Sequence, residues 1–272
     1  MSVAPSSSFP ITTGRRRQWL TTESLLLSAN ANVIPGIAWM ILEVLQRPAL
    51  LAQVRALSAP CLDLFADTSA PNVDIERLCR VPLLQSIYAE VLRRHNAAVL
   101  ARVPLTDDFT LGGWTFDKGD PIVISSYNAA HEPSVWNEGT LRDHHPVHQF
   151  WPERFIVDPQ DGPSGPVQRD PQPDAAPEKG SEAPYFSLKG TEGSWNPYGS
   201  GFRMCPGRHF AKKEMIITMV MFLASFDVDL TPREDWVQDD FGYFMCGVMP
   251  PKGPVAARVR RRNEMSVAQG AP

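Results

Sequence analysis

The sequence predicts a mainly α-helical protein with small β-sheets, an α+β fold. Three stretches have the apolar spacing of helices, namely residues 22–46, 83–93 and 207–226. Residues 109–116 form two alternating runs around Gly112-Gly113, a pattern typical of a β-hairpin, and residues 121–124 have the composition of a further strand. The expected architecture therefore consists of long helices separated by short strands.

Length and composition indicate one large domain. The chain has 272 residues and a net charge of −4, which gives no electrostatic case for binding nucleic acid. We expect a disordered tail over residues 1–18, a domain over 19–262 and a C-terminal tail over 263–272. Within the domain, residues 160–184 are dense in Pro, Gly, Asp and Gln, which predicts a disordered insertion.

Residues 198–207, Tyr-Gly-Ser-Gly-Phe-Arg-Met-Cys-Pro-Gly, place Cys205 on a glycine-rich hairpin just before an apolar helix. A helix N-terminus and nearby backbone N–H groups favour the thiolate, and a thiolate is a suitable axial ligand for haem iron. Arg203 is suited to binding a haem propionate. Three glycines allow tight turns close to a flat macrocycle: Gly199, Gly201 and Gly207. The alternative is a buried cysteine after an ordinary glycine-rich turn.

The whole pattern, aromatic-x-x-Gly-x-Arg-x-Cys-x-Gly, resembles the signature of the cytochrome P-450 family of haem-thiolate enzymes. Tyr198 stands where the family usually has Phe. The resemblance extends over residues 19–262 and corresponds to the C-terminal half of a family member, from its long distal helix onward. It implies a partial cytochrome P-450 fold and haem b as the cofactor, with Cys205 as its axial thiolate ligand.

The resemblance also implies partners and a location. Family members receive electrons from an NADPH-dependent flavoprotein reductase and act on lipophilic small molecules. Full-length members lie in the endoplasmic reticulum membrane, and we expect no membrane anchor in this chain. A basic group at the start of the helix over 207–226 either docks the reductase or forms a solvated turn: Arg208, His209, Lys212 and Lys213. The sequence leaves the oligomeric state open.

Glu90 and Arg93 are three residues apart on the helix over 83–93, so they share a face and are expected to form an ion pair. Most such pairs are solvated surface bridges. This pair precedes Pro152-Glu-Arg-Phe155, an order that resembles two further segments of the family. The resemblance implies that Glu90, Arg93 and Arg154 form a buried triad that braces the loop carrying Cys205.

Arg102 lies just before the predicted hairpin over 109–116. In the family, an arginine at this place reaches a haem propionate, so the resemblance makes Arg102 a second propionate ligand beside Arg203. The alternative is a solvated arginine in a loop.

Pro35 has no N–H, so it is expected to kink the helix over 22–46 and to leave the carbonyl of Ala31 unpaired. By residue composition alone, this is a kinked core helix with two surface amides. The family usually has an acid-threonine pair here, and Asn32 occupies the threonine position. An Asn followed by a Pro resembles the branch of sterol 7α-hydroxylases and prostacyclin synthase, which implies a catalytic role for Asn32. An amide can hydrogen-bond a bound oxygen or organise water, but it is a poor proton donor by itself.

The implied function is that of a monooxygenase that inserts one oxygen atom from O2 into a lipophilic substrate. One alternative is a haem-thiolate isomerase that rearranges a peroxide without O2. Another is a non-catalytic fragment that does not retain haem. Because the resemblance covers only half of a family member, we expect the apolar faces of residues 25–45 and 215–223 to face water.

A histidine cluster, His144, His145 and His148, raises the separate question of a metal site. No cysteine or acidic residue recurs near it at a defined spacing, and Pro146 favours an exposed loop.

Overall fold

The computed structural model describes residues 30–63, 72–168, 183–231 and 237–262. The predicted tails over 1–18 and 263–272 lie outside these residues, as do the first residues of the predicted helix over 22–46.

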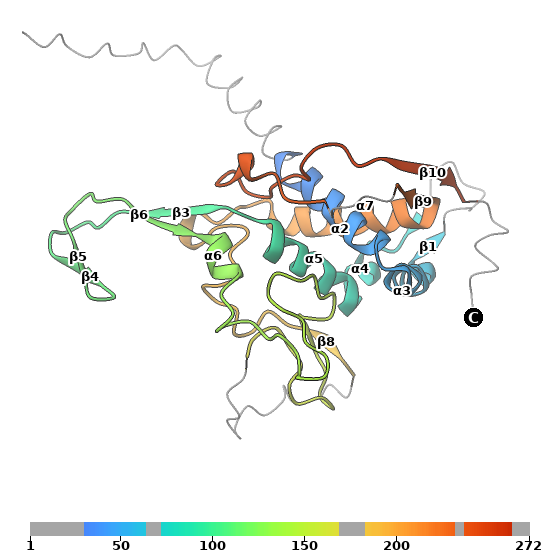
Figure 1. Ribbon diagram of the computed structural model, residues 1–272, viewed down its shortest axis with the longest axis horizontal. Coiled ribbons are helices and arrows are strands. Elements are labelled where there is room, and N and C mark those ends of the chain that lie inside the picture. The colour runs from blue at the N-terminus through green and yellow to red at the C-terminus, as the bar shows by residue number, and fades with distance from the viewer. Residues whose placement is uncertain (1–29, 64–71, 169–182, 232–236, 263–272) are drawn as a thin grey trace, which may run out of the picture.

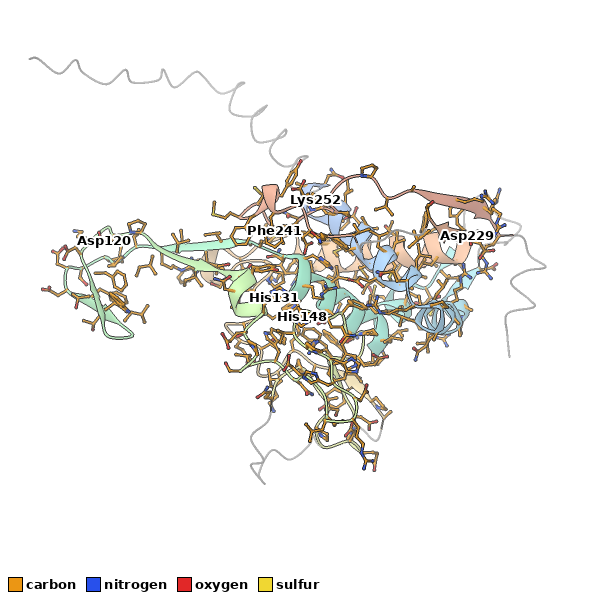
Figure 2. The ribbon with its side chains drawn as sticks, in the orientation of Figure 1. Asp120, His131, His148, Asp229, Phe241 and Lys252 are labelled. Atoms are coloured by element: carbon orange, nitrogen blue, oxygen red, sulfur yellow. The ribbon has the colours of Figure 1, made fainter. Side chains whose placement is uncertain are left out.

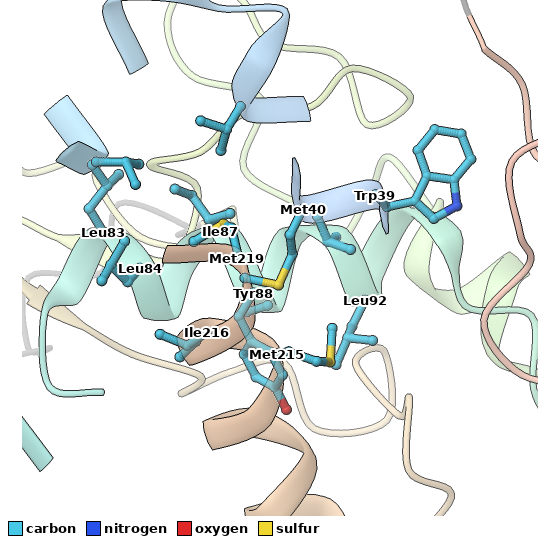
Figure 3. Packing of buried hydrophobic residues seen from close by; sticks show 14 of the residues in the cluster. Trp39, Met40, Leu83, Leu84, Ile87, Tyr88, Leu92, Met215, Ile216 and Met219 are labelled. Carbon is cyan, nitrogen blue, oxygen red and sulfur yellow. The ribbon is translucent and has the colours of Figure 1, made fainter. Parts of the chain in front are cut away.

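Three helices pack against one another and form the centre of the molecule (Figure 1): α2 (Val33–Leu45), α5 (Pro82–His95) and α7 (Arg208–Ser225). Figure 3 shows Met40 of α2, Ile87 of α5 and Met219 of α7 meeting in this core. α3 (Pro48–Ser58) contacts α2 and α7, and the short α4 (Ile75–Leu78) lies against α7.

The prediction that the apolar faces of residues 25–45 and 215–223 would face water was wrong for most of the described part of these segments, although Ile34 is 61% exposed. Trp39 and Met40 are fully buried, and so are Ile216, Met219 and Leu223. The physical reason is that α2, α5 and α7 bury their apolar faces mainly against one another.

Short antiparallel pairs make up the sheets. The pairs are β1 (Leu62–Asp63) with β2 (Asn72–Val73), β3 (Val99–Arg102) with β6 (Ile122–Ser125), β4 (Phe109–Leu111) with β5 (Trp114–Phe116), β7 (Ile156–Val157) with β8 (Tyr185–Phe186), and β9 (Phe226–Leu230) with β10 (Ala257–Arg261). β4 and β5 confirm the predicted hairpin, with left-handed Gly112 and Gly113 at its turn. Figures 1 and 2 show β3–β6 extending from the helices as an arm, with Asp120 near its far end.

The remaining elements are one short α-helix and three 3₁₀ turns: α6 (Ser126–Ala130), η1 (Ala59–Cys61), η2 (Gly201–Arg203) and η3 (Phe241–Tyr243). Both α6 and η3 begin with a side-chain cap. Ser125 accepts a hydrogen bond from the N–H of Asn128, and Asp240 accepts one from the N–H of Gly242.

The helix predicted over 22–46, with a kink at Pro35, is interrupted at Asn32. Asn30 and Ala31 are helical, Asn32 is a turn residue, and α2 begins at Val33. Pro35 therefore lies in the first turn of α2, where a missing N–H costs no intrahelical hydrogen bond. The expected kink takes the form of this break, because a helix that restarts before a proline avoids the clash that a continuous helix would have.

The structure describes residues 160–168 of the predicted disordered insertion over 160–184, and part of this segment is hydrogen-bonded to Asn137. The side-chain amide of the buried Asn137 donates hydrogen bonds to the carbonyls of Pro163 (2.6 Å) and Gly165 (2.7 Å). The backbone N–H of Asn137 donates a third hydrogen bond, to the carbonyl of Pro166 (2.8 Å). Hydrogen bonds to one buried amide fix this segment, so its polar composition is misleading. Residues 169–182 lie outside the described part of the chain.

Among the described residues, no single helix is long and apolar enough to cross a membrane. The pair Val33–Leu45 and Pro48–Cys61 meets these criteria only when taken together, with a bend of 113° between its two members.

Candidate haem-binding site

Cys205 lies in the loop between η2 and α7, and its side chain is exposed. The N–H of Cys205 donates to the carbonyl of Tyr198 at 2.9 Å, which closes the loop. Gly199 (φ 75°) and Gly201 (φ 71°) have left-handed backbone conformations that favour glycine. Gly207 differs, because its φ of −78° is open to other residues. The exposure of Cys205 contradicts the alternative of a buried cysteine.

Arg102 of β3 reaches the same loop. Its guanidinium donates hydrogen bonds to the carbonyl (3.1 Å) and the hydroxyl (2.8 Å) of Ser200. The side chain is exposed, and it comes from a strand rather than from a loop. Its Nη2 lies 3.7 Å from the place that a Cβ at Gly201 would take. Arg203 lies in η2, and its side chain is outside what the structure describes.

The structure brings Glu90, Arg93 and Arg154 together in the interior, with all three side chains buried. Arg93 donates to both carboxylate oxygens of Glu90 at 2.7 and 2.9 Å, and Nε of Arg154 lies 3.1 Å from Oε1 of Glu90. Burial raises the pKa of the Glu90 carboxyl, but the two guanidinium groups outweigh it and bring this pKa down to about 2.

The two guanidinium groups of the triad also bind loop carbonyls. Arg93 donates to Ala130 (2.7 Å) and Val147 (2.6 Å). Arg154 donates to the carbonyls of four further residues: Asn137, His145, Pro146 and Gln149. The triad therefore joins α5 to the long loop region between α6 and β7.

The same helix α5 holds the segment that leads to Cys205. The indole N–H of Trp195 donates to the carbonyl of Ala89 (3.0 Å), next to Glu90, and the amide of Asn96 donates to the carbonyl of Pro197 (3.3 Å). The triad and the Cys205 loop thus share one helix, which is the geometry that a bracing role requires.

Sequence reasoning missed a tyrosine pair beneath the loop. The hydroxyls of Tyr88 and Tyr198 lie 2.6 Å apart, and burial raises the pKa of both, in the case of Tyr198 to about 12. These two side chains line a cavity of about 340 Å³ together with Phe186, Trp195 and Lys212. The aromatic ring at position 198 was the one signal available, since nothing local in the sequence connects it to Tyr88.

The predicted basic group at the start of α7 is only partly open to a partner. The Lys212 ammonium donates to Oε1 of Gln85 at 2.5 Å and lies over the ring of Phe186, and burial lowers the pKa of this lysine. Lys213 pairs with Glu76, while His209 is exposed. Arg208 donates to the carbonyl of Cys205 at 3.1 Å.

Asn32 lies at the N-cap of α2, but its side chain does not cap that helix. Its Oδ1 instead accepts a hydrogen bond from the N–H of Val248 at 2.9 Å. In the described part of the chain, no hydrogen bond joins Asn32 to the Cys205 loop. The oxygen that was expected to act on a bound ligand is therefore engaged with backbone.

The three histidines do not come together as ligands. His144 Nε2 lies 3.5 Å from Oε2 of Glu138. His145 Nε2 lies 3.0 Å from Oδ1 of Asp143, and the His145 ring stacks on Trp151. Within residues 30–63, 72–168, 183–231 and 237–262, no group of three or more His, Cys, Asp or Glu side chains is placed to hold a metal ion.

Comparison with known proteins decides the family. The model of the cytochrome P450 family matches residues 20–255. The chain belongs to the cytochrome P450 family. Two curated relatives are each 40% identical to it: the cytochrome P450 monooxygenases efuG of Hormonema carpetanum, over 243 residues, and fsoE of Humicola fuscoatra, over 247 residues. The branch of sterol 7α-hydroxylases and prostacyclin synthase, inferred from Asn32 and Pro35, is not supported by these relatives.

These matches cover 88% and 90% of this chain but only 42% of each relative. The crystal structure of the cytochrome P450DA heme domain matches with a TM-score of 0.59 and 18% identity, over 86% of this chain and 42% of that one. This likeness concerns the fold, which is a partial cytochrome P450 fold. The chain spans less than half the length of the P450 proteins it matches.

The cofactor of this family is haem with a thiolate ligand, and the residues present fit that group. The thiol of Cys205 is exposed, and a Cβ added at Gly199 would meet no atom within 4 Å, so this loop has an open face. Phe202 and Met204 add exposed apolar side chains, which suit the faces of a porphyrin. The Arg102 guanidinium of β3 lies against the same loop and is suited to a propionate.

Proposed function

We propose that this chain is the C-terminal part of a haem-thiolate monooxygenase that inserts one oxygen atom from O2 into a lipophilic substrate. An NADPH-dependent flavoprotein reductase would supply the electrons. The observation that carries the proposal is the exposed Cys205, held in a loop with two left-handed glycines. The segment that leads to this loop is anchored to the helix that carries Glu90 and Arg93 of the buried triad.

In this proposal, Cys205 holds the haem iron through its sulfur, and Arg102 and Arg203 bind the propionates. Bound haem would supply oxygen activation, and its thiolate ligand favours cleavage of the O–O bond. The position of the sulfur is supported by the hydrogen bond from the Cys205 N–H to the Tyr198 carbonyl. It is also supported by the bond from the Trp195 indole to the Ala89 carbonyl of α5 and by the bond from the Asn96 amide to the Pro197 carbonyl. Because the ligand is already held in place, less conformational entropy is lost when the cofactor binds.

The test is the carbon monoxide difference spectrum of the reduced 272-residue chain after haem addition. We expect a thiolate-type band in the wild type, its loss in Cys205→Ser, and its retention in Cys246→Ser, which removes the other exposed thiol. Absence of the band in the wild type, or its persistence in Cys205→Ser, would contradict the proposal. Gel filtration with a haem assay identifies a non-catalytic fragment as a species without haem, and turnover of a peroxide without NADPH or reductase identifies an isomerase.

A further inference from the structure

The cavity beneath the Cys205 loop is large enough to hold a small organic molecule. Its volume of about 340 Å³ lies within the range of about 300–1,000 Å³ that is usual for ligand pockets. Aromatic side chains from α5, β8 and the segment before Cys205 line it: Tyr88, Phe186, Trp195 and Tyr198. Met204 also lines the cavity and is 39% exposed, so solvent reaches this side. Such a lining suits a ligand with a flat apolar body.

The charged side chains around this cavity are cations. Arg208 and Lys212 of α7 line it together with His209, and none of its described lining residues is Asp or Glu. Lys213, the next residue along the helix, is paired with Glu76, whereas no carboxylate among the described residues pairs with Lys212. Cations without a counter-charge beside an apolar cavity favour a ligand that brings a negative charge.

Lys212 is the cation best placed to hold such a charge. Its ammonium lies 5.1 Å from the ring centre of Phe186 and 5.9 Å from that of Tyr88, so it stands among the rings of the cavity. Among the described residues, it donates to Oε1 of Gln85 at 2.5 Å. Because an ammonium group has three N–H donors, two are left for a ligand. Burial lowers the pKa of this lysine, and an anion beside it would favour the charged form.

The tyrosine pair supplies a further donor. The hydroxyls of Tyr88 and Tyr198 lie 2.6 Å apart, so one of their two protons is shared between these oxygens. The other proton has no acceptor among the described residues, and a buried hydroxyl is stabilised by finding one. Because both tyrosines line the cavity, an anionic oxygen bound there can accept this hydrogen bond.

We propose that this cavity is a binding site for a small organic anion, a carboxylate joined to an aromatic or similarly flat apolar body. Lys212 binds the carboxylate, and the rings of Phe186 and Trp195 pack against the body. Cys205 does not belong to the lining, so the site is separate from the proposed ligand sulfur. Binding of the anion needs no haem, and the inference therefore does not rest on the proposed function.

Equilibrium dialysis of the haem-free 272-residue chain tests the site. The probes are 2-naphthoate and 2-naphthamide, which share one ring system and differ in charge. We expect saturable binding of one naphthoate per chain, and binding of naphthamide that is weaker by about tenfold, the effect of one hydrogen bond to a charged group. Absence of saturable naphthoate binding would overturn the site. Equal binding of the two probes would overturn the role of charge.

Substitution of Lys212 tests which cation holds the anion. Lys212→Met should weaken naphthoate by about tenfold and leave naphthamide unchanged, because only the charged donor is lost. Lys213→Met is the matched control, since it removes the same charge from the next residue, which does not line the cavity. This control should bind both probes as the wild type does. Equal losses of naphthoate binding in the two variants would indicate general attraction to a basic surface and would overturn the proposed contact.

The same dialysis on the haem-loaded chain distinguishes the cavity from the haem site. We expect the affinity for naphthoate to stay within about twofold of that of the haem-free chain, because Cys205 lies outside the lining. Release of naphthoate on haem loading would show that the two ligands share one site and would overturn the inference. Because the comparison of naphthoate with naphthamide needs no haem, failure of the anion site and failure of haem binding give different results.

Discussion

At the scale of single residues, we predict that the position of Cys205 depends on the carboxylate of Glu90, although no hydrogen bond joins the two among the described residues. Glu90 is buried between two guanidinium groups, and Trp151 also donates its N–H to this carboxylate at 3.2 Å. A buried pair of this kind contributes little when it replaces apolar packing, but removing one partner leaves an uncompensated charge.

We therefore predict that Glu90→Gln lowers the free energy of unfolding by about 3–5 kcal/mol, because two buried arginines lose their counter-charge. Glu76→Gln, which breaks the exposed pair with Lys213, is the matched control and should change it by less than about 1 kcal/mol. Urea denaturation of both variants measures the difference. Similar small losses in the two would show that the triad is dispensable.

The same carboxylate sets a pH dependence. Because the pKa of Glu90 in the folded chain is about 2, below its ordinary 4.5, its contribution is complete above about pH 4.5 and is lost as the pH falls toward 2. In Glu90→Gln, this loss of folding free energy at acid pH should be absent when urea denaturation is compared at pH 5 and pH 3.

We predict a second pH dependence of stability, at higher pH, from His131 at the C-terminus of α6. Burial lowers the pKa of this imidazole from 6.5 to about 4, and its Nδ1–H donates to the carbonyl of Tyr127 at 2.8 Å. The unfolded chain binds the proton more readily, so stability should fall as the pH drops from about 6.5 to 4. Denaturation at pH 7.5 and pH 5 should show a smaller difference in His131→Gln than in the wild type. An equal difference would mean that His131 does not titrate in this window.

The sequence could predict the contacts that are local or that belong to a motif. Glu90 and Arg93 share a helix face by spacing, and Arg154 followed from its segment. The Tyr88–Tyr198 and Asn32–Val248 contacts join residues 110 and 216 positions apart, so no periodicity reports them. These contacts depend on how α2, α5 and the last loops pack together, and the sequence next to each residue gives no sign of that packing.

At the scale of elements, the closeness of α2 and α7 depends on a glycine. A Cβ at Gly36 would lie 2.5 Å from the terminal methyl of Met215. The two helices contact each other, and Gly36 of α2 faces Met215 of α7. The Met215 side chain is flexible at this end, so a small addition can be absorbed but a large one cannot.

Gly36→Ala should change the free energy of unfolding by no more than about 1 kcal/mol, because a gain in helix propensity offsets the movement of Met215. Gly36→Leu should lower it by about 1–3 kcal/mol by forcing the helices apart. Ala49→Leu, at an exposed position of α3, is the control for added side-chain volume. If Gly36→Leu were as stable as this control, the helices would not meet at Gly36.

Element types were more predictable than element ends. Apolar periodicity located α5 and α7 and the β4–β5 hairpin, because each buries a face or turns at glycines. The start of α2 at Val33 and the order of residues 160–168 were missed. The restart of α2 before Pro35 is a local effect that apolar periodicity does not locate. The hydrogen bonds from Asn137 to residues 163–166 are tertiary contacts that composition does not reveal.

At the scale of the whole molecule, a closed helical core carries an open cofactor face. The packing of α2, α5 and α7 supplies the core with the residues of this chain alone. The arm formed by β3–β6 and the β4–β5 hairpin projects from that core (Figure 1), and exposed apolar side chains such as Leu105 and Trp114 lie on it. This arrangement places the proposed ligand sulfur on a supported surface and leaves room for a macrocycle above it.

The most direct test of this account is iron X-ray absorption of the haem-loaded 272-residue chain. The account predicts a sulfur atom in the first coordination shell of iron in the wild type and in Cys246→Ser, and none in Cys205→Ser. A wild-type spectrum without sulfur, or a sulfur signal that survives in Cys205→Ser, would contradict it.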